Sequence, residues 1–351
     1  MAEPETLPLQ SDAFAPWPWQ SDAYAQLAQR FQEGRFPHAL MLLGPAGVGK
    51  RQLTVSLASL LLCEAPVAHS GYARACGECK QCLLMAGEGH LDARRLLPTD
   101  QSRYIRIHQV RALGRFVMES PQVARRKVAV IERADQLNLN AANALLKTLE
   151  EPPADTFVLV LQREGQPVLP TIRSRCQVLR VEAPTTAEAR QWLAQHRSDD
   201  TPALDRALRW AGGAPLEAVR LLEANRPEQR AQCLKALQQA LKAEITLSEA
   251  VKPFLAMPLM EALDLLQGWA LDLARAGADP EAVADGEAAP MLRFLAGRRH
   301  PSELTAIHEA IMDVRRGLDY NVNPELELIG VLELWCQLMR RSGDAKSAMS
   351  R

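Results

Sequence analysis

The 351-residue sequence lacks the features that mark membrane, secreted and broadly nucleic-acid-binding chains. No apolar run reaches the roughly 18 residues that a membrane span needs. The N-terminus has neither a basic start nor an apolar stretch, so it does not resemble a secretory signal. The formal net charge is only −1, so any contact with nucleic acid has to come from a local patch. We expect a cytoplasmic protein whose thiols stay reduced.

The chain is too long for one ordinary core, and its length predicts two or three domains. A hydrophobic share of 47% with 24% charged residues is typical of a globular protein. The first 16 residues are rich in Pro, Glu and Ala, and the last ten (342–351) are polar. We expect both ends, 1–16 and 342–351, to be disordered.

Short apolar runs alternate with helical patterns in the first half of the chain. The expected strands are 40–43, 128–131, 157–161 and 178–181, and one clear helix covers 141–149. Strands that alternate with helices predict an α/β fold with a parallel sheet.

Beyond about residue 184 the strand patterns stop, and helical patterns continue to about residue 341. The last helix is the best marked. Asn323 can cap it, Pro324 suits its first turn, and apolar residues follow at helical spacing. The sequence therefore predicts one α/β domain followed by helical domains.

A phosphate-binding loop follows the first expected strand, but its last residue is changed. It reads Gly-Pro-Ala-Gly-Val-Gly-Lys-Arg, which fits G-x-x-x-x-G-K-[ST] up to Lys50. Gly44, Gly47 and Gly49 let backbone N–H groups turn toward phosphate oxygens, and Lys50 would reach the outer phosphates. Arg51 replaces the hydroxyl that binds Mg²⁺, and a permanent cation cannot coordinate a metal ion. We expect a P-loop fold without productive Mg-ATP chemistry.

The strand that should carry the second half of an ATPase site is altered as well. In P-loop ATPases an acidic residue at this strand end binds Mg²⁺, and a further group orients the attacking water. Here the strand 128–131 ends in Glu132 and Arg133. Glu132 could still face a metal ion, but Arg133 stands where the water-orienting carboxylate belongs and cannot accept a proton. A solvated Glu-Arg pair is the plain alternative. Two basic replacements at one site favour a disabled ATPase.

Four of the seven cysteines crowd together, with the spacing Cys63-x₁₂-Cys76-x₂-Cys79-x₂-Cys82. In a reducing compartment such a cluster points to a metal ion rather than to disulfides. Four thiolates suit tetrahedral Zn²⁺, and two-residue gaps let consecutive ligands turn around one ion. An Fe–S cluster and a set of free thiols are the alternatives. We favour a closed, structural Zn²⁺ site in a module spanning 63–82.

Several sequence words together resemble one protein family. The stretch 143–153 reads Asn-Ala-Leu-Leu-Lys-Thr-Leu-Glu-Glu-Pro-Pro, and Ser174-Arg175-Cys176 follows it. Both words, and a Cys₄ module after the P-loop helix, are similar to those of the clamp-loader ATPases of bacterial DNA polymerase III. The resemblance is strong over about 18–220. Further on it extends only to length and helical character.

The resemblance implies a domain layout. An AAA+ P-loop domain with a parallel sheet would cover 17–183, with the zinc module at 63–82 inserted in it. A small helical lid domain would cover 184–226, and an all-α collar domain, which joins subunits, would cover 227–341.

Within this family, gamma/tau subunits hydrolyse ATP, whereas delta-prime subunits often have an eroded site and keep the Ser-Arg-Cys word. This chain resembles the second kind. The resemblance assigns Arg175 as an arginine finger that reaches a neighbouring subunit's ATP, where a guanidinium offsets charge on the transferred phosphoryl group. Leu216 stands where the family's sensor arginine belongs, and Gln162 stands about where its sensor threonine does. Because Lys50 is retained, binding of ATP or ADP without turnover stays open. Taken singly, Arg175 is an ordinary surface arginine.

The resemblance implies a subunit of the DNA polymerase III holoenzyme, a DNA-directed DNA polymerase. It would assemble with gamma/tau and delta subunits in a hetero-oligomeric ring that loads the sliding clamp on primed DNA. The alternative is an active gamma/tau-type ATPase, but Arg51 and Arg133 argue against it. A third interpretation, a stand-alone zinc-ribbon nucleic-acid binder, is weaker because the chain has a P-loop and a small net charge. The basic segment 94–127 faces DNA or an acidic partner, or it is solvated surface.

Overall fold

The computed structural model describes residues 14–87, 89–98, 104–199, 201–224, 226–283, 285–298, 304–317 and 323–339. The chain divides into two compact units, Met1–Leu221 and Leu222–Arg351. Of the two segments expected to be disordered, 1–13 and 342–351 lie outside the described residues.

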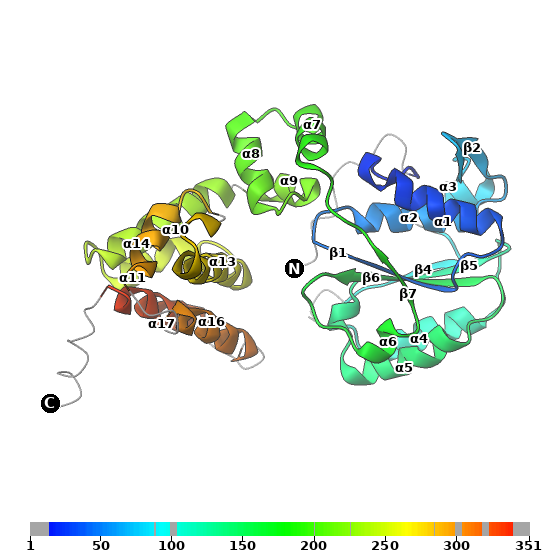
Figure 1. The fold of residues 1–351 in the computed structure, drawn as a ribbon. Coiled ribbons are helices and arrows are strands. Elements are labelled where there is room, and N and C mark those ends of the chain that lie inside the picture. The colour runs from blue at the N-terminus through cyan, green and yellow to red at the C-terminus, as the bar shows by residue number, and fades with distance from the viewer. Residues whose placement is uncertain are drawn as a thin grey trace. The chain divides into compact units, whose positions relative to one another are not determined.

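The first unit is built on a five-stranded sheet in which every neighbouring pair runs parallel, in the order β4-β5-β6-β1-β7 (Figure 1). The strands are β1 (Ala39–Gly44), β4 (Ala93–Leu96), β5 (Lys127–Ile131), β6 (Thr156–Arg163) and β7 (Gln177–Arg180). The three central strands β5, β6 and β1 are buried almost throughout, as a parallel sheet covered on both faces requires. The parallel sheet expected from the alternating pattern is confirmed, and each of the four expected strands ends within two residues of its prediction.

Helices cover both faces of this sheet (Figure 1). Three lie on one face, α1 (Ser21–Gln32), α2 (Lys50–Leu62) and α3 (Lys80–Ala86). The other face carries α4 (Ile107–Met118), α5 (Leu139–Glu150) and α6 (Pro170–Arg173). Each face has its own apolar core. Leu53 and Leu57 of α2 belong to one, and Leu113 of α4 and Leu145 of α5 belong to the other. Two short 3₁₀ turns, η1 (Pro18–Gln20) and η2 (Ala134–Gln136), precede α1 and α5.

A small hairpin joins α2 to α3. Its strands, β2 (Val67–His69) and β3 (Tyr72–Arg74), pair antiparallel. Ser70 and Gly71 both have positive φ at the tip, as a two-residue hairpin turn of the primed type requires. The hairpin brings the residues on either side of it together, which positions the cysteine cluster.

Three helices follow the sheet, α7 (Thr186–His196), α8 (Thr201–Trp210) and α9 (Pro215–Glu223). A capping box formed by Thr185 and Glu188 starts α7. Gly212 and Gly213, both with positive φ, end α8 and turn the chain into α9. The start of α9 thereby reaches the P-loop.

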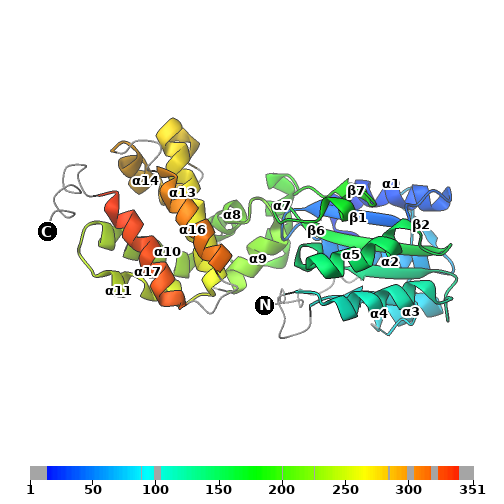
Figure 2. The same ribbon diagram turned by 90° about the horizontal axis from the view of Figure 1, so that it is seen from below.

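The second unit is helical in all of its described residues that have regular structure. Its elements are α10 (Arg226–Leu241), α11 (Leu247–Ala250), α12 (Lys252–Leu255), α13 (Leu259–Ala278), η3 (Pro280–Ala282), α14 (Ala289–Ala296), α16 (Ala306–Gly317) and α17 (Pro324–Gln337). Figure 2 shows α13, α16 and α17 side by side. The expected start of α17 is confirmed, because the Asn323 side chain accepts from the Glu325 N–H and Pro324 is the first helical residue. Trp269 and Trp335 are buried in the core of this unit. None of the described helices is long and apolar enough to cross a membrane.

Candidate functional sites

The P-loop lies between the end of β1 and the first residue of α2, the strand–loop–helix order expected from the sequence. Gly49, at φ 85°, is the N-cap of α2. The ammonium group of Lys50 donates to two carbonyls of the loop itself, Gly44 O at 2.8 Å and Pro45 O at 2.5 Å. The ammonium group of Lys50 is therefore bound to carbonyl oxygens of the loop itself.

The start of α9 lies directly on Gly47. The backbone N–H of Leu216 donates to Gly47 O at 3.1 Å. A Cβ placed on Gly47 would lie only 2.3 Å from the backbone nitrogen of Glu217, and Gly47 also has φ 71°. Leu216 stands where the family's sensor arginine was expected. Through its backbone N–H, Leu216 attaches the start of α9 to the loop.

An N-terminal aromatic segment covers the loop at Val48 and Gly49. Trp19 Nε1 and Gln20 Nε2 both donate to Val48 O, at 3.0 and 2.8 Å. A Cβ placed on Gly49 would lie 2.3 Å from Cδ1 of Trp17. The P-loop is thus in contact with residues from the N-terminal segment and from α9 at once.

Trp192 of α7 completes this aromatic cluster. The rings of Trp17 and Trp19 stack with centroids 5.6 Å apart, and Trp192 meets both edge-on at 5.1 and 5.7 Å. Such ring pairs add to the stability gained from burial alone. The cluster was not expected from the sequence. The Pro-Trp-Pro-Trp motif supplies two of its three rings, but the motif alone does not indicate that they pack together.

Residues just before the cluster are also packed, although they fall in the segment expected to be disordered. Phe14 is buried against Cys63 and Cys82. Gln52 Nε2 donates to Ala15 O at 2.7 Å. These contacts attach the N-terminal segment to α2 and to the cysteine cluster.

Glu132, expected at the metal-binding end of β5, is paired with two arginines. Its Oε1 accepts from Nε of Arg95 at 2.5 Å and lies 3.7 Å from Nε of Arg51. The Glu132 side chain is only 9% exposed, so this carboxylate is well shielded from solvent. Arg51, expected in place of the Mg²⁺-binding hydroxyl, therefore lies against the carboxylate that was expected to face the same metal ion.

The two remaining departures from an ATPase site also have contacts of their own. Arg133 pairs with Asp135, with Nη2 to Oδ2 at 3.0 Å. The side chain of Gln162 is buried on β6, where Nε2 donates to the carbonyls of Arg163 and Gln166 at 3.0 and 2.8 Å.

The four cysteines Cys63, Cys76, Cys79 and Cys82 meet in one cluster. Their sulfur atoms all lie within 4.8 Å of one another, and the closest pairs are 3.6–3.9 Å apart. A tetrahedron of thiolates around Zn²⁺, with Zn–S near 2.3 Å, has sulfur atoms ~3.8 Å apart. The four sulfur atoms are therefore arranged so that they could hold a metal ion.

The local chain explains this arrangement. Cys63 ends α2, and Cys79 is the N-cap of α3. Gly77 has φ 81°, which allows the turn between the second and third cysteine. The backbone N–H groups of Cys76 and Cys79 donate to Sγ of Cys63 and of Cys76, respectively. Such donors stabilise negative charge on sulfur.

The cysteines differ in their electrostatic surroundings. Burial raises the pKa of the Cys63 and Cys82 thiols. Burial also opposes ionisation of Cys79, but hydrogen bonds from the backbone of Glu64 and Cys82 outweigh it and lower the pKa of Cys79 to about 6. Buried thiols ionise together only when a cation balances their charge.

Arg175 follows α6 by two residues and contacts the last residue of α5. Its Nε donates to Oε1 of Glu150 at 2.5 Å, and its Nη2 pairs with the same oxygen. Its Nη1 donates to Thr171 O at 3.0 Å. The side chain remains 32% exposed. The structure thus brings together the two sequence words that carried the resemblance, because Glu150 belongs to the first and Arg175 to the second.

The basic segment 94–127 is not one continuous patch. Lys127 is buried and donates to the carbonyls of Phe116 and Glu119. Arg95 pairs with Glu132, and Arg126 pairs with Asp155 at 3.6 Å. The exposed arginines that remain among its described residues include Arg106 at the N-cap of α4, Arg111 and Arg115 on α4, and Arg125 before β5.

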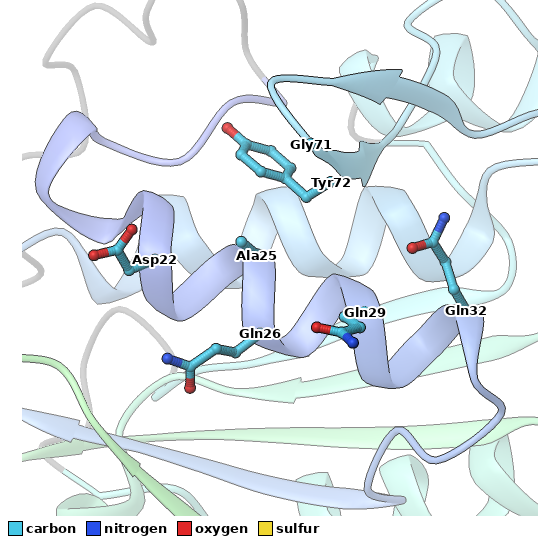
Figure 3. A pocket seen from close by; sticks show the side chains of 7 residues that line it. All are labelled: Asp22, Ala25, Gln26, Gln29, Gln32, Gly71 and Tyr72. Carbon is cyan, nitrogen blue, oxygen red and sulfur yellow. The ribbon is translucent and has the colours of Figure 1, made fainter.

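An open pocket of 330 Å³ lies between α1 and the β2–β3 hairpin (Figure 3). Its polar side chains are three amides, one carboxylate and one phenol, from Gln26, Gln29, Gln32, Asp22 and Tyr72. None of its lining residues belongs to the P-loop, the Glu132 cluster or the cysteine cluster, and we assign no chemistry to it.

Comparison with known proteins identifies the family. A family model described as "DNA polymerase III, delta subunit" matches residues 19–185. The chain is 36% identical over 327 residues to the DNA polymerase III subunit delta' of Pseudomonas aeruginosa, covering 92% of this chain and 98% of that protein. The chain belongs to the delta-prime subunit family of DNA polymerase III. The resemblance given by the words around Glu150 and Arg175 is thereby confirmed.

The delta-prime family is related to the tau/gamma subunits. The DNA polymerase III subunit tau/gamma of Haemophilus influenzae is 30% identical over 202 residues, which is 56% of this chain and 28% of that protein. A crystal structure of a DNA polymerase III gamma-subunit-related protein from Thermotoga maritima covers 90% of this chain and 100% of its own, at 21% identity and a TM-score of 0.40.

Proposed function

We propose that this delta-prime family chain assembles with gamma/tau and delta subunits in a hetero-oligomeric ring that loads the sliding clamp on primed DNA. It does not hydrolyse ATP at its own P-loop, and it donates Arg175 to the ATP of a neighbouring subunit. The observation that carries the assignment is the 36% identity to a delta-prime subunit over 98% of that protein's length. Its place of action is the cytoplasm, in the DNA polymerase III holoenzyme.

The contacts around the P-loop support a disabled ATP site. The loop's outer surface is already covered, because Leu216 of α9 donates to Gly47 O, Trp19 and Gln20 donate to Val48 O, and Trp17 packs against Gly49. Mg²⁺ would have to compete with two guanidinium groups for the carboxylate of Glu132. Catalysis of phosphoryl transfer depends on a metal ion bridging the phosphates and on a positioned water. Arg51 and Arg95 lie against the carboxylate that would bind the metal ion, and Arg133 stands in place of the water-orienting group.

Helices α7–α9 act as the lid domain, and α10–α17 act as the collar that joins subunits. In the lid, the contact of Leu216 with Gly47 and the packing of Trp192 on Trp17 take over the role that bound nucleotide has in an ATPase. These contacts hold α7–α9 against the P-loop.

The cysteine cluster holds one structural Zn²⁺. All four ligands come from the protein, so no coordination position is left for substrate, which is typical of a structural site. The ion ties the end of α2 to the β2–β3 hairpin and to α3, and Phe14 covers it from the N-terminal segment.

The proposed function and its alternative, an active gamma/tau-type ATPase, differ in whether the isolated chain hydrolyses ATP. We expect the purified chain to turn over ATP no faster than its Lys50→Ala variant, because Arg51 and Arg133 replace the metal-binding and water-orienting groups. The measurement is steady-state phosphate release with Mg²⁺. Since a contaminating ATPase would affect both proteins equally, Mg²⁺-dependent hydrolysis that the Lys50 change abolishes would establish the alternative.

Assembly is the direct test of the proposed function. We expect the chain to co-elute with gamma/tau and delta subunits in gel filtration, and to be required for loading of the clamp onto a primed template. A complex of gamma/tau and delta that loads the clamp equally well without this chain would contradict the proposal.

A further inference from the structure

The Ser174-Arg175-Cys176 word forms a tight turn that is anchored to the core of the first unit. Ile172 is fully buried beneath it, and the N–H of Arg175 donates to Ile172 O at 3.1 Å. Cys176 packs against the same core from the far side of the turn. Ser174 Oγ donates to Thr171 O at 3.1 Å. The backbone of Arg175 is thus held in place, but its long side chain needs contacts of its own.

Those contacts come from the end of α5. The carboxylate of Glu150 binds Nε and Nη2 along one edge of the guanidinium, and Thr171 O binds Nη1. A guanidinium has five N–H donors in a fixed plane. Among the described contacts three of these five donors are engaged, and the two that remain sit on the outer nitrogens Nη1 and Nη2. Two such donors match the geometry in which arginine grips two phosphate oxygens.

We infer that Glu150 is a positioning residue for Arg175, an inference that rests on the proposed role of Arg175 as a finger in trans. Glu150 orients the guanidinium plane and directs its outer N–H groups toward a neighbour's phosphates. The side chains of Glu150 and Arg175 are 46% and 32% exposed, so the ion pair contributes little to folding. The ion pair matters for catalysis instead, because it orients a guanidinium that must reach the transferred phosphoryl group. Small misplacements of reacting groups slow catalysis.

The test uses the complete complex with gamma/tau, delta, clamp and primed template. We expect Glu150→Gln to lower the kcat for ATP about threefold without changing the KM, since Gln keeps the shape but loses the charge that fixes the guanidinium. The matched control is Glu151→Gln. It removes the same charge one residue later, on an exposed side chain that does not contact Arg175 among the described residues. That control should stay within about 1.5-fold of the unmodified complex.

A double-mutant cycle separates positioning from a structural role. The variant with both Glu150→Gln and Arg175→Ala should be no slower than Arg175→Ala alone, because Glu150 acts only through Arg175. If Arg175→Ala slows the complex but Glu150→Gln leaves it unchanged or faster, the positioning role is wrong and the proposed finger stands. The positioning role would also be wrong if the losses of the two single variants added up in the double variant. If Arg175→Ala itself has no effect, both the finger and this inference fail.

Discussion

Replacing Cys79 by Ser should remove Zn²⁺ from the chain and lower the melting temperature of the first unit by roughly 6–20 °C. Zinc binding to four thiolates contributes about 10–16 kcal/mol in small zinc-finger peptides. If a third of that free energy stabilises this larger unit, the loss is about 3–5 kcal/mol, and each kcal/mol shifts the midpoint by about 2–4 °C at this size. Chelation of the unmodified chain should have the same effect. The measurements are metal content per chain and thermal unfolding.

Cys176→Ser is the matched control for this change. Cys176 is also half-buried, but it lies outside the four-sulfur cluster. Burial raises the pKa of its thiol to about 11, and among the described residues it belongs to no group of side chains that could hold a metal ion. The control should keep one Zn²⁺ per chain. Full zinc after Cys79→Ser, or iron with the visible absorption of an Fe–S cluster, would contradict the zinc assignment.

The sheet could be predicted from the sequence wherever a strand is buried on both faces. The runs at 40–43 and 128–131 are continuous apolar stretches because they become β1 and β5 in the middle of the sheet. Strand β4 was missed because it lies at the sheet edge, where the exposed Arg94 and Arg95 interrupt the pattern. The β2–β3 hairpin was missed because its strands have three residues each, too few for a periodicity.

The candidate site could be predicted only where spacing along the chain carries the information. The cysteine cluster and the P-loop have such spacing, and the structure brings each of them together. The contacts made by Trp17 with Gly49 and by Leu216 with Gly47 join residues 32 and 169 positions apart. No local pattern encodes a contact of that kind, because it depends on how helices α7–α9 and the N-terminal segment fold back.

The same reasoning explains why the sequence did not decide what the Glu132 carboxylate binds. From the sequence, the partner of this acidic residue is either a metal ion or the neighbouring Arg133 in a solvated pair. In the structure, Arg95 on the neighbouring strand β4 and Arg51 on α2 converge on its carboxylate. A shielded carboxylate needs a cation. The guanidinium groups of Arg95 and Arg51 supply that positive charge.

Arg175→Ala should lower the ATPase rate of the complete complex about tenfold and slow clamp loading onto primed DNA. Arginine fingers supplied in trans are worth about 10³–10⁵ in kcat in GTPases. The loss should be smaller here if, in the proposed ring, more than one subunit supplies a finger. Arg175→Lys should rescue poorly, since an ammonium lacks the planar fork that binds two phosphate oxygens. The measurement is steady-state ATP hydrolysis with clamp and primed template present.

Arg173→Ala is the control, because Arg173 is an exposed arginine only two residues away. It removes the same charge from the same turn but should leave the rate unchanged. Both variants should fold normally and keep their zinc, since removing a partly exposed arginine usually changes stability by about 0.5 kcal/mol or less. Gel filtration must show that each variant enters the complex. Given that, equal rates for Arg175→Ala, Arg175→Lys and the unmodified chain would mean that Arg175 is an ordinary surface residue. A loss shared by Arg173→Ala would instead point to the net charge of the turn, because only a guanidinium at one defined position can contact the phosphoryl group.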